Sequence, residues 1–375
     1  MKRLICLLLV FFLFSGIAHS APVAPKIVSP SAVVMERDTG KVIYKKDPHA
    51  KRPPASVTKV MTLLLVMEAI DSGKINLQDS VSVSEHAAGM GGSQVFLSPG
   101  EEMSVHDMLK ATVIASGNDS AVALAEHIAG SEEGFVSLMN ERAKQLGMKD
   151  TTFKNCTGLD AEGHLTSAYD IALMSRELIK HKKIKEYTTI WMDSLRNGAF
   201  TLANTNKLIR SYRGITGLKT GSTSVAKFCL AATAERDGME LIATIMAAPS
   251  GKERFSDASK LLDFGFANYA LYSISEELSP DRIPVVLGNE DFVSLEFGSV
   301  PSTLIEKNSL SGIDKEFSIP DDVKAPVKQG QTIGTAKIFS NETLLCEVPI
   351  IAKNDVNRMS FGDIFDRIVS KVFLR

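Results

Sequence analysis

Hydrophobic and polar positions change their period several times along this chain. A nearly continuous apolar run at residues 57–70, closed by Asp71-Ser72-Gly73, predicts a buried helix, because a helix that is apolar on all sides has no face for solvent. Amphipathic spacing predicts further helices at residues 104–115, 121–129, 134–146, 167–179 and 253–264, and Asp119-Ser120 can cap the second of these. Strand-like runs stand on both sides of the helical region, at residues 32–36, 42–44, 215–220, 228–233 and 239–246. Strands at both ends with helices between them predict an α/β fold, in which one antiparallel sheet is assembled from distant segments and flanked by helices.

Two further segments follow this α/β unit. Short apolar runs separated by Gly, Pro, Asn and Asp predict a small all-β sandwich domain at residues 276–353. Within residues 354–375, apolar side chains recur at helical spacing from Phe361 onward, while Arg358 and Lys371 lie on the other face. This pattern predicts a basic amphipathic helix that lies on a membrane surface; the alternative is that it docks on the chain's own β domain.

The first twenty residues differ in composition from the rest. Lys2 and Arg3 precede an apolar run at residues 4–17, and small residues follow it at Ala18 and Ser20. This order predicts a cleaved secretory signal at residues 1–20, the alternative being an uncleaved membrane anchor. In both cases we expect the α/β unit, residues 21–275, to be exported to the outer face of the cytoplasmic membrane, the cell wall or the periplasm.

Charge and composition exclude some classes of function. The 42 basic and 44 acidic residues nearly balance, so no overall field attracts a polyanion, and we expect no nucleic-acid partner. Three cysteines follow the signal, Cys156, Cys229 and Cys346; they are odd in number and far apart, which predicts no disulfide framework. The histidines and cysteines do not have the spacing of metal ligands, so we expect no metal and no cofactor.

The spacing Ser-x-x-Lys occurs twice, in two different contexts. Ser56 and Lys59 stand at the start of the helix predicted at 57–70, where residues three apart share a face, so the amine can reach the hydroxyl. Ser224 and Lys227 enter a strand, where residues three apart point to opposite faces. A serine hydroxyl needs a nearby base to act as a nucleophile, so Ser56 and Lys59 are the candidate nucleophile and base. Taken alone, the pair also fits a surface lysine near a helix start.

A second motif, Ser116-Gly117-Asn118, separates two predicted helices. Ser116 is the candidate proton relay to a leaving amine, and Asn118 is the amide expected to hold Lys59 and the substrate backbone in place. As an isolated motif it also fits an ordinary break between helices.

The third motif, Lys219-Thr220-Gly221, lies on a predicted strand. It offers a cation and a hydroxyl for an anionic substrate, and a glycine that allows close approach of a ligand. Burial and the charge of Lys219 would lower the pKa of Lys59, as a general base requires. The backbone amides of Ser56 and Ser222 are the expected donors of an oxyanion hole. The order of the three motifs is what predicts a serine acyl-transfer enzyme.

With these motifs, the chain resembles the secreted serine-type D-alanyl-D-alanine carboxypeptidases, the low-molecular-mass penicillin-binding proteins. The resemblance covers almost the whole chain after residue 20 and includes Pro54-Ala55, Gly92-Ser93 and Gly158-Leu159. It implies a β-lactamase- or transpeptidase-like domain, a peptidoglycan stem peptide as substrate, and acylation by β-lactam antibiotics. It implies that the enzyme removes the terminal D-alanine through an acyl-enzyme on Ser56. Cys156 departs from the family pattern, which often has proline at that loop position.

Three alternatives share parts of this pattern. A class A β-lactamase has the first and third motifs, but it normally carries Ser-Asp-Asn and a Glu-x-x-Leu-Asn segment, and neither stands between residues 116 and 219. A D,D-endopeptidase that cleaves the cross-links between stem peptides would use the same three motifs. A non-catalytic wall-binding scaffold would retain the fold, and the complete set of motifs argues against it. Arg254 is a weaker candidate for the substrate carboxylate and is left out of the predicted site.

Overall fold

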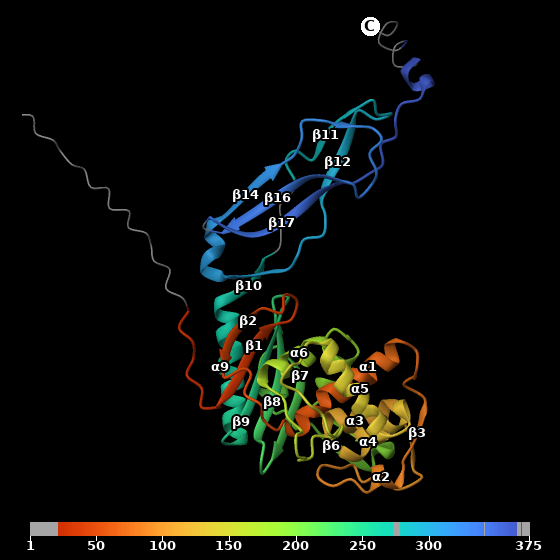
Figure 1. The fold of residues 1–375 in the computed structure, drawn as a ribbon, viewed down its shortest axis with the longest axis vertical. Helices are drawn as coiled ribbons and strands as arrows, with labels where there is room; N and C mark the ends of the chain where they lie inside the picture. The colour runs from red at the N-terminus through yellow and green to blue at the C-terminus, as the bar shows by residue number, and fades with distance from the viewer. Residues whose placement is uncertain (1–21, 273–277, 341, 366–368, 370–375) are drawn as a thin grey trace, which may run out of the picture.

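The computed structural model describes residues 22–272, 278–340, 342–365 and 369. Figure 1 shows a body of helices packed on a sheet and, beyond it, an elongated β domain that leads to the C-terminus. The predicted signal at residues 1–20 lies outside the described residues. The α/β fold predicted from the sequence is confirmed.

A five-stranded antiparallel sheet forms the centre of the first body, in the order β2-β1-β9-β8-β7. Its strands are β1 (Ser31–Glu36), β2 (Val42–Lys46), β7 (Ile215–Thr223), β8 (Lys227–Arg236) and β9 (Met239–Ala248). The first two come from the start of the chain and the other three from beyond the helical region, as the sequence predicts. The tight turn between β8 and β9 uses Asp237 and Gly238 at positive φ, which matches the predicted hairpin.

Helices cover both faces of this sheet because its side chains alternate between two cores. Val33, Met35 and Ile242 join the core made with α1 and α6, whereas Val34 and Leu241 join the core made with α9. The helices and 3₁₀ turns are η1 (Ala55–Thr58), α1 (Lys59–Asp71), α2 (Glu85–Ala88), α3 (Val105–Ile114), α4 (Asn118–Ala129), α5 (Glu132–Gln145), α6 (Ala168–Leu178), α7 (Ile184–Thr188), η2 (Arg196–Gly198), α8 (Leu208–Ser211) and α9 (Gly251–Asn268). Two small ribbons, β3 (Ser80–Ser82) with β4 (Glu102–Ser104) and β5 (Met192–Leu195) with β6 (Phe200–Ala203), complete this body.

One helix start differs from the prediction. The sequence places the start at Ala121 with Asp119 as a cap, but α4 begins at Asn118 behind Gly117. The Asp119 carboxylate instead accepts hydrogen bonds from the backbone amides of Val95 and Leu97, at 2.9 and 3.2 Å. The Asp119 side chain, which local propensity would place at a helix cap, therefore makes a buried contact with a distant loop.

The C-terminal domain is all-β, as predicted. Its sheet has the order β14-β16-β17-β12-β11-β15 and encloses an aliphatic core that includes Val293, Val327 and Ile350. The elements of this part are β10 (Tyr269–Tyr272), β11 (Arg282–Val286), β12 (Phe292–Phe297), β13 (Thr303–Glu306), η3 (Lys307–Gly312), β14 (Ile313–Ser318), β15 (Val323–Lys324), β16 (Thr332–Ser340) and β17 (Thr343–Ala352). Strand β10, which continues from α9, pairs with β13 and so ties the two bodies together.

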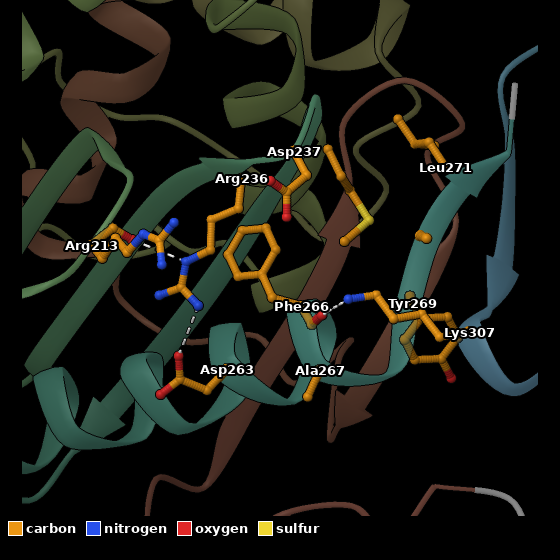
Figure 2. A pocket seen from close by; sticks show the side chains of 11 residues that line it. Arg213, Arg236, Asp237, Asp263, Phe266, Ala267, Tyr269, Leu271 and Lys307 are labelled. Carbon is orange, nitrogen blue, oxygen red and sulfur yellow. Dashed lines mark hydrogen bonds and ion pairs between the residues drawn. The ribbon is translucent and has the colours of Figure 1, made fainter.

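A pocket of about 460 Å³ lies at this junction (Figure 2). Arg236 stacks between the rings of Tyr212 and Phe266, with its guanidinium carbon 4.7 and 4.6 Å from the two ring centres. Its Nη1 is 3.3 Å from the Asp263 carboxylate. Lys307, the first residue of η3, donates from Nζ to the carbonyl oxygen of Phe266 at 2.7 Å. The Lys307 contact joins the end of α9 to the β domain, whereas the Arg236 contacts join α9 to the end of β8.

The predicted amphipathic helix is described only in part. Residues 354–360 are not helical, and Val356 and Arg358 form bridges to Val327 and Gly288. Residues 361–365 are helical, and Phe361 and Phe365 are 86% and 60% exposed. The remainder lies outside the described residues, apart from residue 369. Within the part of the chain that the structure describes, no helix has the length and apolarity needed to cross a bilayer.

Candidate active site

Ser56 lies in the short 3₁₀ turn η1, which leads directly into α1. The turn is entered through Ala55, whose φ of 49° is uncommon for a residue with a side chain. Two glycines pack against its backbone. A Cβ at Gly158 would stand 1.9 Å from the Ala55 carbonyl oxygen, and a Cβ at Gly221 would stand 2.8 Å from the amide nitrogens of Ser56 and Val57. The position of Ser56 therefore depends on close backbone approaches from two distant segments.

Lys59 is fully buried and points back toward Ser56. Its Nζ lies 3.2 Å from Ser56 Oγ, 2.5 Å from Asn118 Oδ1 and 2.8 Å from the carbonyl oxygen of Thr157. The amine thus has three oxygen partners. Two belong to the first and second motifs, and the third, the Thr157 carbonyl, lies in a loop outside all three motifs. This geometry allows proton transfer between the serine hydroxyl and the lysine amine.

The second motif is held between helices α3 and α4. Asn118 is 3% exposed, and its Nδ2 donates to the carbonyl of Gly91 at 2.6 Å while its Oδ1 accepts from Lys59. Ser116 is also buried and has a φ of 64°, a strained backbone of the kind that often marks functional sites. No hydrogen bond joins Ser116 to Lys59 or to Lys219 among the residues that the structure describes.

The third motif lies on β7, the edge strand next to Ser56. Lys219 is 1% exposed and its Nζ is 3.1 Å from the carbonyl oxygen of Thr220. The Thr220 hydroxyl donates to Thr205 Oγ1 at 2.6 Å. Ser222 is exposed, beyond the glycine that abuts the Ser56 amide. The three motifs, separated by some hundred and sixty residues in sequence, thus meet around Ser56.

Burial controls the electrostatics of the two lysines. It lowers the pKa of Lys59 to about 7, against smaller opposing effects of Cys156 and Asp119. Burial also lowers the pKa of Lys219 well below its usual value, and the positive charges of Lys59 and Arg254 lower it further. Two buried ammonium groups in one site disfavour each other, so one of them gives up its proton easily near neutral pH. A neutral amine beside a serine hydroxyl is what a general base requires.

Several residues near the site were missed in the sequence. The carbonyl of Thr157 and the hydroxyl of Thr205 contact Lys59 and Thr220, yet a backbone carbonyl and a lone threonine leave no signature in a sequence. Arg254, only a weak candidate from the sequence, donates from Nη1 to the carbonyls of Gly221 and Cys229, at 3.0 and 3.3 Å. In this structure it supports the strand that carries the third motif.

A buried lysine within reach of a serine hydroxyl, on an α/β body of this kind, defines a serine acyl-transfer hydrolase. Comparison with known families makes the class more specific. Residues 18–250 match the family model of the peptidase S11 D-alanyl-D-alanine carboxypeptidases, and residues 266–358 match that of the penicillin-binding protein 5 C-terminal domain. The chain belongs to the D-alanyl-D-alanine carboxypeptidase family.

Individual relatives agree with this assignment over most of their length. The D-alanyl-D-alanine carboxypeptidase DacF of Bacillus subtilis is 46% identical, over 92% of this chain and 88% of that protein. DacC of Escherichia coli is 33% identical, over 96% and 93%. The crystal structure of penicillin-binding protein 5 from Haemophilus influenzae superposes with a TM-score of 0.74 at 30% identity, covering 90% of this chain and 99% of that one. Penicillin-binding protein D2 of Listeria monocytogenes, solved in an ampicillin-bound form, has a TM-score of 0.59 at 32% identity and covers 64% of this chain and 100% of that one.

The predicted class of enzyme is therefore confirmed: the protein is a serine-type D-alanyl-D-alanine carboxypeptidase. These comparisons support neither the β-lactamase alternative nor the non-catalytic scaffold alternative.

Proposed function

We propose that Ser56 is the nucleophile and Lys59 its general base in the removal of the terminal D-alanine from peptidoglycan stem peptides. The neutral Lys59 amine accepts the hydroxyl proton while Ser56 Oγ forms a bond to the carbonyl carbon between the two D-alanines. The observation that carries this proposal is the 3.2 Å distance between Nζ and Oγ, combined with burial that lowers the pKa of Lys59 to about 7.

The negative charge that develops on the carbonyl oxygen needs two donors. We assign these to the backbone N–H groups of Ser56 and Ser222, because Gly221 brings the edge of β7 against the Ser56 amide. Replacing this glycine would push the two donors apart. The first turn of α1 directs further partial positive charge toward the same place.

Collapse of the intermediate breaks the bond between the carbonyl carbon and the D-alanine nitrogen. The proton then held by Lys59 passes through the Ser116 hydroxyl to the leaving amine, and Lys219 and Thr220 bind the carboxylate of the departing D-alanine. Asn118 keeps Lys59 in position through the contact at Oδ1. Water, deprotonated by the same lysine, hydrolyses the ester on Ser56 and releases the shortened peptide.

A β-lactam is expected to follow the first half of this path. Its strained amide carbonyl takes the place of the scissile one, and the ring-opened product stays attached to Ser56. The support is the family relationship to penicillin-binding proteins, including a relative solved with ampicillin bound.

The test is a comparison of Ser56→Ala with Ser224→Ala. Ser224 belongs to the other Ser-x-x-Lys pair and is exposed, so it serves as a matched control. Intact-protein mass spectrometry after penicillin treatment should show one adduct on the parent and on Ser224→Ala, and none on Ser56→Ala. Release of D-alanine should follow the same pattern. Labelling of the Ser56→Ala protein would refute the assignment.

We also propose that the protein works outside the cytoplasm, on the membrane surface. The support is the signal-like pattern at residues 1–20, the family's peptidoglycan substrate, and the exposed aromatic side chains of Phe361 and Phe365 at the start of the terminal helix.

A further inference from the structure

His164 is a buried histidine close to the site that none of the three motifs includes. It is 2% exposed, and its Nε2 lies 2.8 Å from the Oγ1 of Thr58, which is itself completely buried. Thr58 stands between the nucleophile and Lys59 in sequence. Neither η1 nor α1 has a side-chain cap at its start, so the orientation of this turn must come from contacts with other segments.

The hydrogen bonds of His164 define its tautomer. Nδ1 lies 2.9 Å from the backbone nitrogen of Lys154, and because a backbone N–H can only donate, Nδ1 must accept. The neutral ring therefore carries its hydrogen on Nε2 and donates it to Thr58. Protonation would place a second N–H against the Lys154 amide. Burial lowers the pKa of His164 to about 4, with Asp160 raising it and Lys154 lowering it by smaller amounts, so the ring stays neutral at physiological pH.

The same histidine closes the loop at residues 154–164. This loop supplies the Thr157 carbonyl that accepts from Lys59 at 2.8 Å, and the Cys156 carbonyl that accepts from Thr62 Oγ1 at 2.6 Å. It also brings Gly158 against the backbone of the nucleophile's turn. By bonding to Lys154 at one end of the loop and to Thr58 in the turn, the imidazole connects the loop with the segment that it supports.

We propose that His164 is a positioning residue that, through Thr58 and the carbonyl of Thr157, holds the proposed base in reach of the nucleophile. It touches neither substrate nor reacting atoms. The inference rests on the proposed roles of Ser56 and Lys59. Loss of the imidazole frees the loop and admits water to Lys59, which reduces the burial that lowers its pKa and makes the ammonium harder to deprotonate, while the amine lies less often near Oγ.

The experiment measures penicillin acylation against pH for His164→Phe, which keeps a ring and removes both hydrogen bonds. Rates are divided by the fraction of folded protein, obtained from thermal unfolding. We expect acylation to slow on the order of 10-fold or more, because small misplacements of catalytic groups are costly. We also expect the acid limb of the profile to move to higher pH, a change that a merely less stable protein would not show.

Two partial replacements test the individual bonds. The amide oxygen of Asn reaches about where Nδ1 lies and can accept from Lys154, whereas Gln reaches about where Nε2 lies and can donate to Thr58. His164→Asn and His164→Gln should therefore each recover part of the acylation rate that His164→Phe loses. The two variants also keep the proposal testable if His164→Phe does not fold. His106→Phe is the matched control, since His106 also makes a side-chain hydrogen bond, to the Tyr187 hydroxyl at 2.8 Å, outside the site.

An unchanged rate and acid limb in the folded His164 variants would overturn the inference, as would an equal change in His106→Phe. That failure is distinct from failure of the proposed function, which would appear as penicillin attached elsewhere than Ser56 in the parent protein.

Discussion

Replacing Lys59 by methionine tests the electrostatic basis of the site most directly. Methionine has a similar length and cannot ionise. Burial lowers the pKa of Lys59 from the ordinary 10.5 to about 7, so folding disfavours its ammonium form by roughly 5 kcal/mol. We therefore expect the variant to lose acylation and yet to become more stable relative to the parent as the pH falls.

The pH dependence follows from the direction of the shift. The unfolded chain keeps the proton on Lys59 up to about pH 10.5, whereas the folded protein releases it from about pH 7. The penalty is thus fully present below pH 7 and disappears as the pH rises toward 10.5. The variant also leaves Asn118 Oδ1 and the Thr157 carbonyl without their donor, which costs about 1–3 kcal/mol for each of the two groups. Because this cost does not depend on pH, the stability of the variant relative to the parent should fall by about 3 kcal/mol between pH 6 and pH 9.

The assay is urea unfolding followed by circular dichroism at several pH values, with the parent measured in parallel. Lys110→Met is the control, because the Lys110 ammonium lies 3.3 Å from both Asp107 and Asp193 and donates to the Ser194 carbonyl. That variant should be less stable than the parent at low pH. If the difference in stability between Lys59→Met and the parent does not vary between about pH 6 and pH 9, the lysine does not carry a burial penalty. The argument for Lys59 as a neutral base would then fail.

Two further predictions concern the loop beside the nucleophile and the end of the chain. Gly158→Ala should reduce acylation by about 10² or more, because the new Cβ would meet the Ala55 carbonyl oxygen at 1.9 Å. The control is Gly163→Ala, which is also at positive φ but has only the Lys154 side chain nearby, at 3.4 Å, and should acylate like the parent. Equal activity of the two variants would contradict the packing argument. Removal of residues 358–375 should release the protein from membranes in a fractionation experiment and leave hydrolysis of a soluble D-alanyl-D-alanine peptide unchanged. A truncated variant that stays in the membrane fraction would show that this segment is not the anchor.

Much of the site could be predicted from the sequence because its first step is local. Ser56 and Lys59 are three residues apart at a helix start, and the period of the helix alone brings the amine toward the hydroxyl. The second Ser-x-x-Lys pair could be set aside for the same reason, since it enters β8. The antiparallel sheet was also predictable, because strand-like runs at the two ends of an α/β unit have few other ways to bury their apolar faces.

Contacts between distant segments could not be predicted, because they involve backbone carbonyls, single hydroxyls and glycines. Such groups occur throughout any sequence and do not mark a site. The carbonyl of Thr157 and the close approach of Gly158 become specific only when the loop at residues 154–164 packs against η1 and α1. The hydroxyl of Thr205 becomes specific only when the segment between β6 and α8 packs against β7. The start of α4 was misplaced for a similar reason, since the Asp119 carboxylate binds a loop some twenty residues away in sequence.

The sequence by itself determined the order of the three motifs and the helix start that brings the Ser56 hydroxyl and the Lys59 amine together. Only the tertiary structure decided that Lys59 is completely removed from water, and with that its pKa and its capacity to act as a base. The physical reason is that burial depends on all the segments packed around a side chain, whereas hydrogen-bond reach along a helix depends only on its neighbours in sequence.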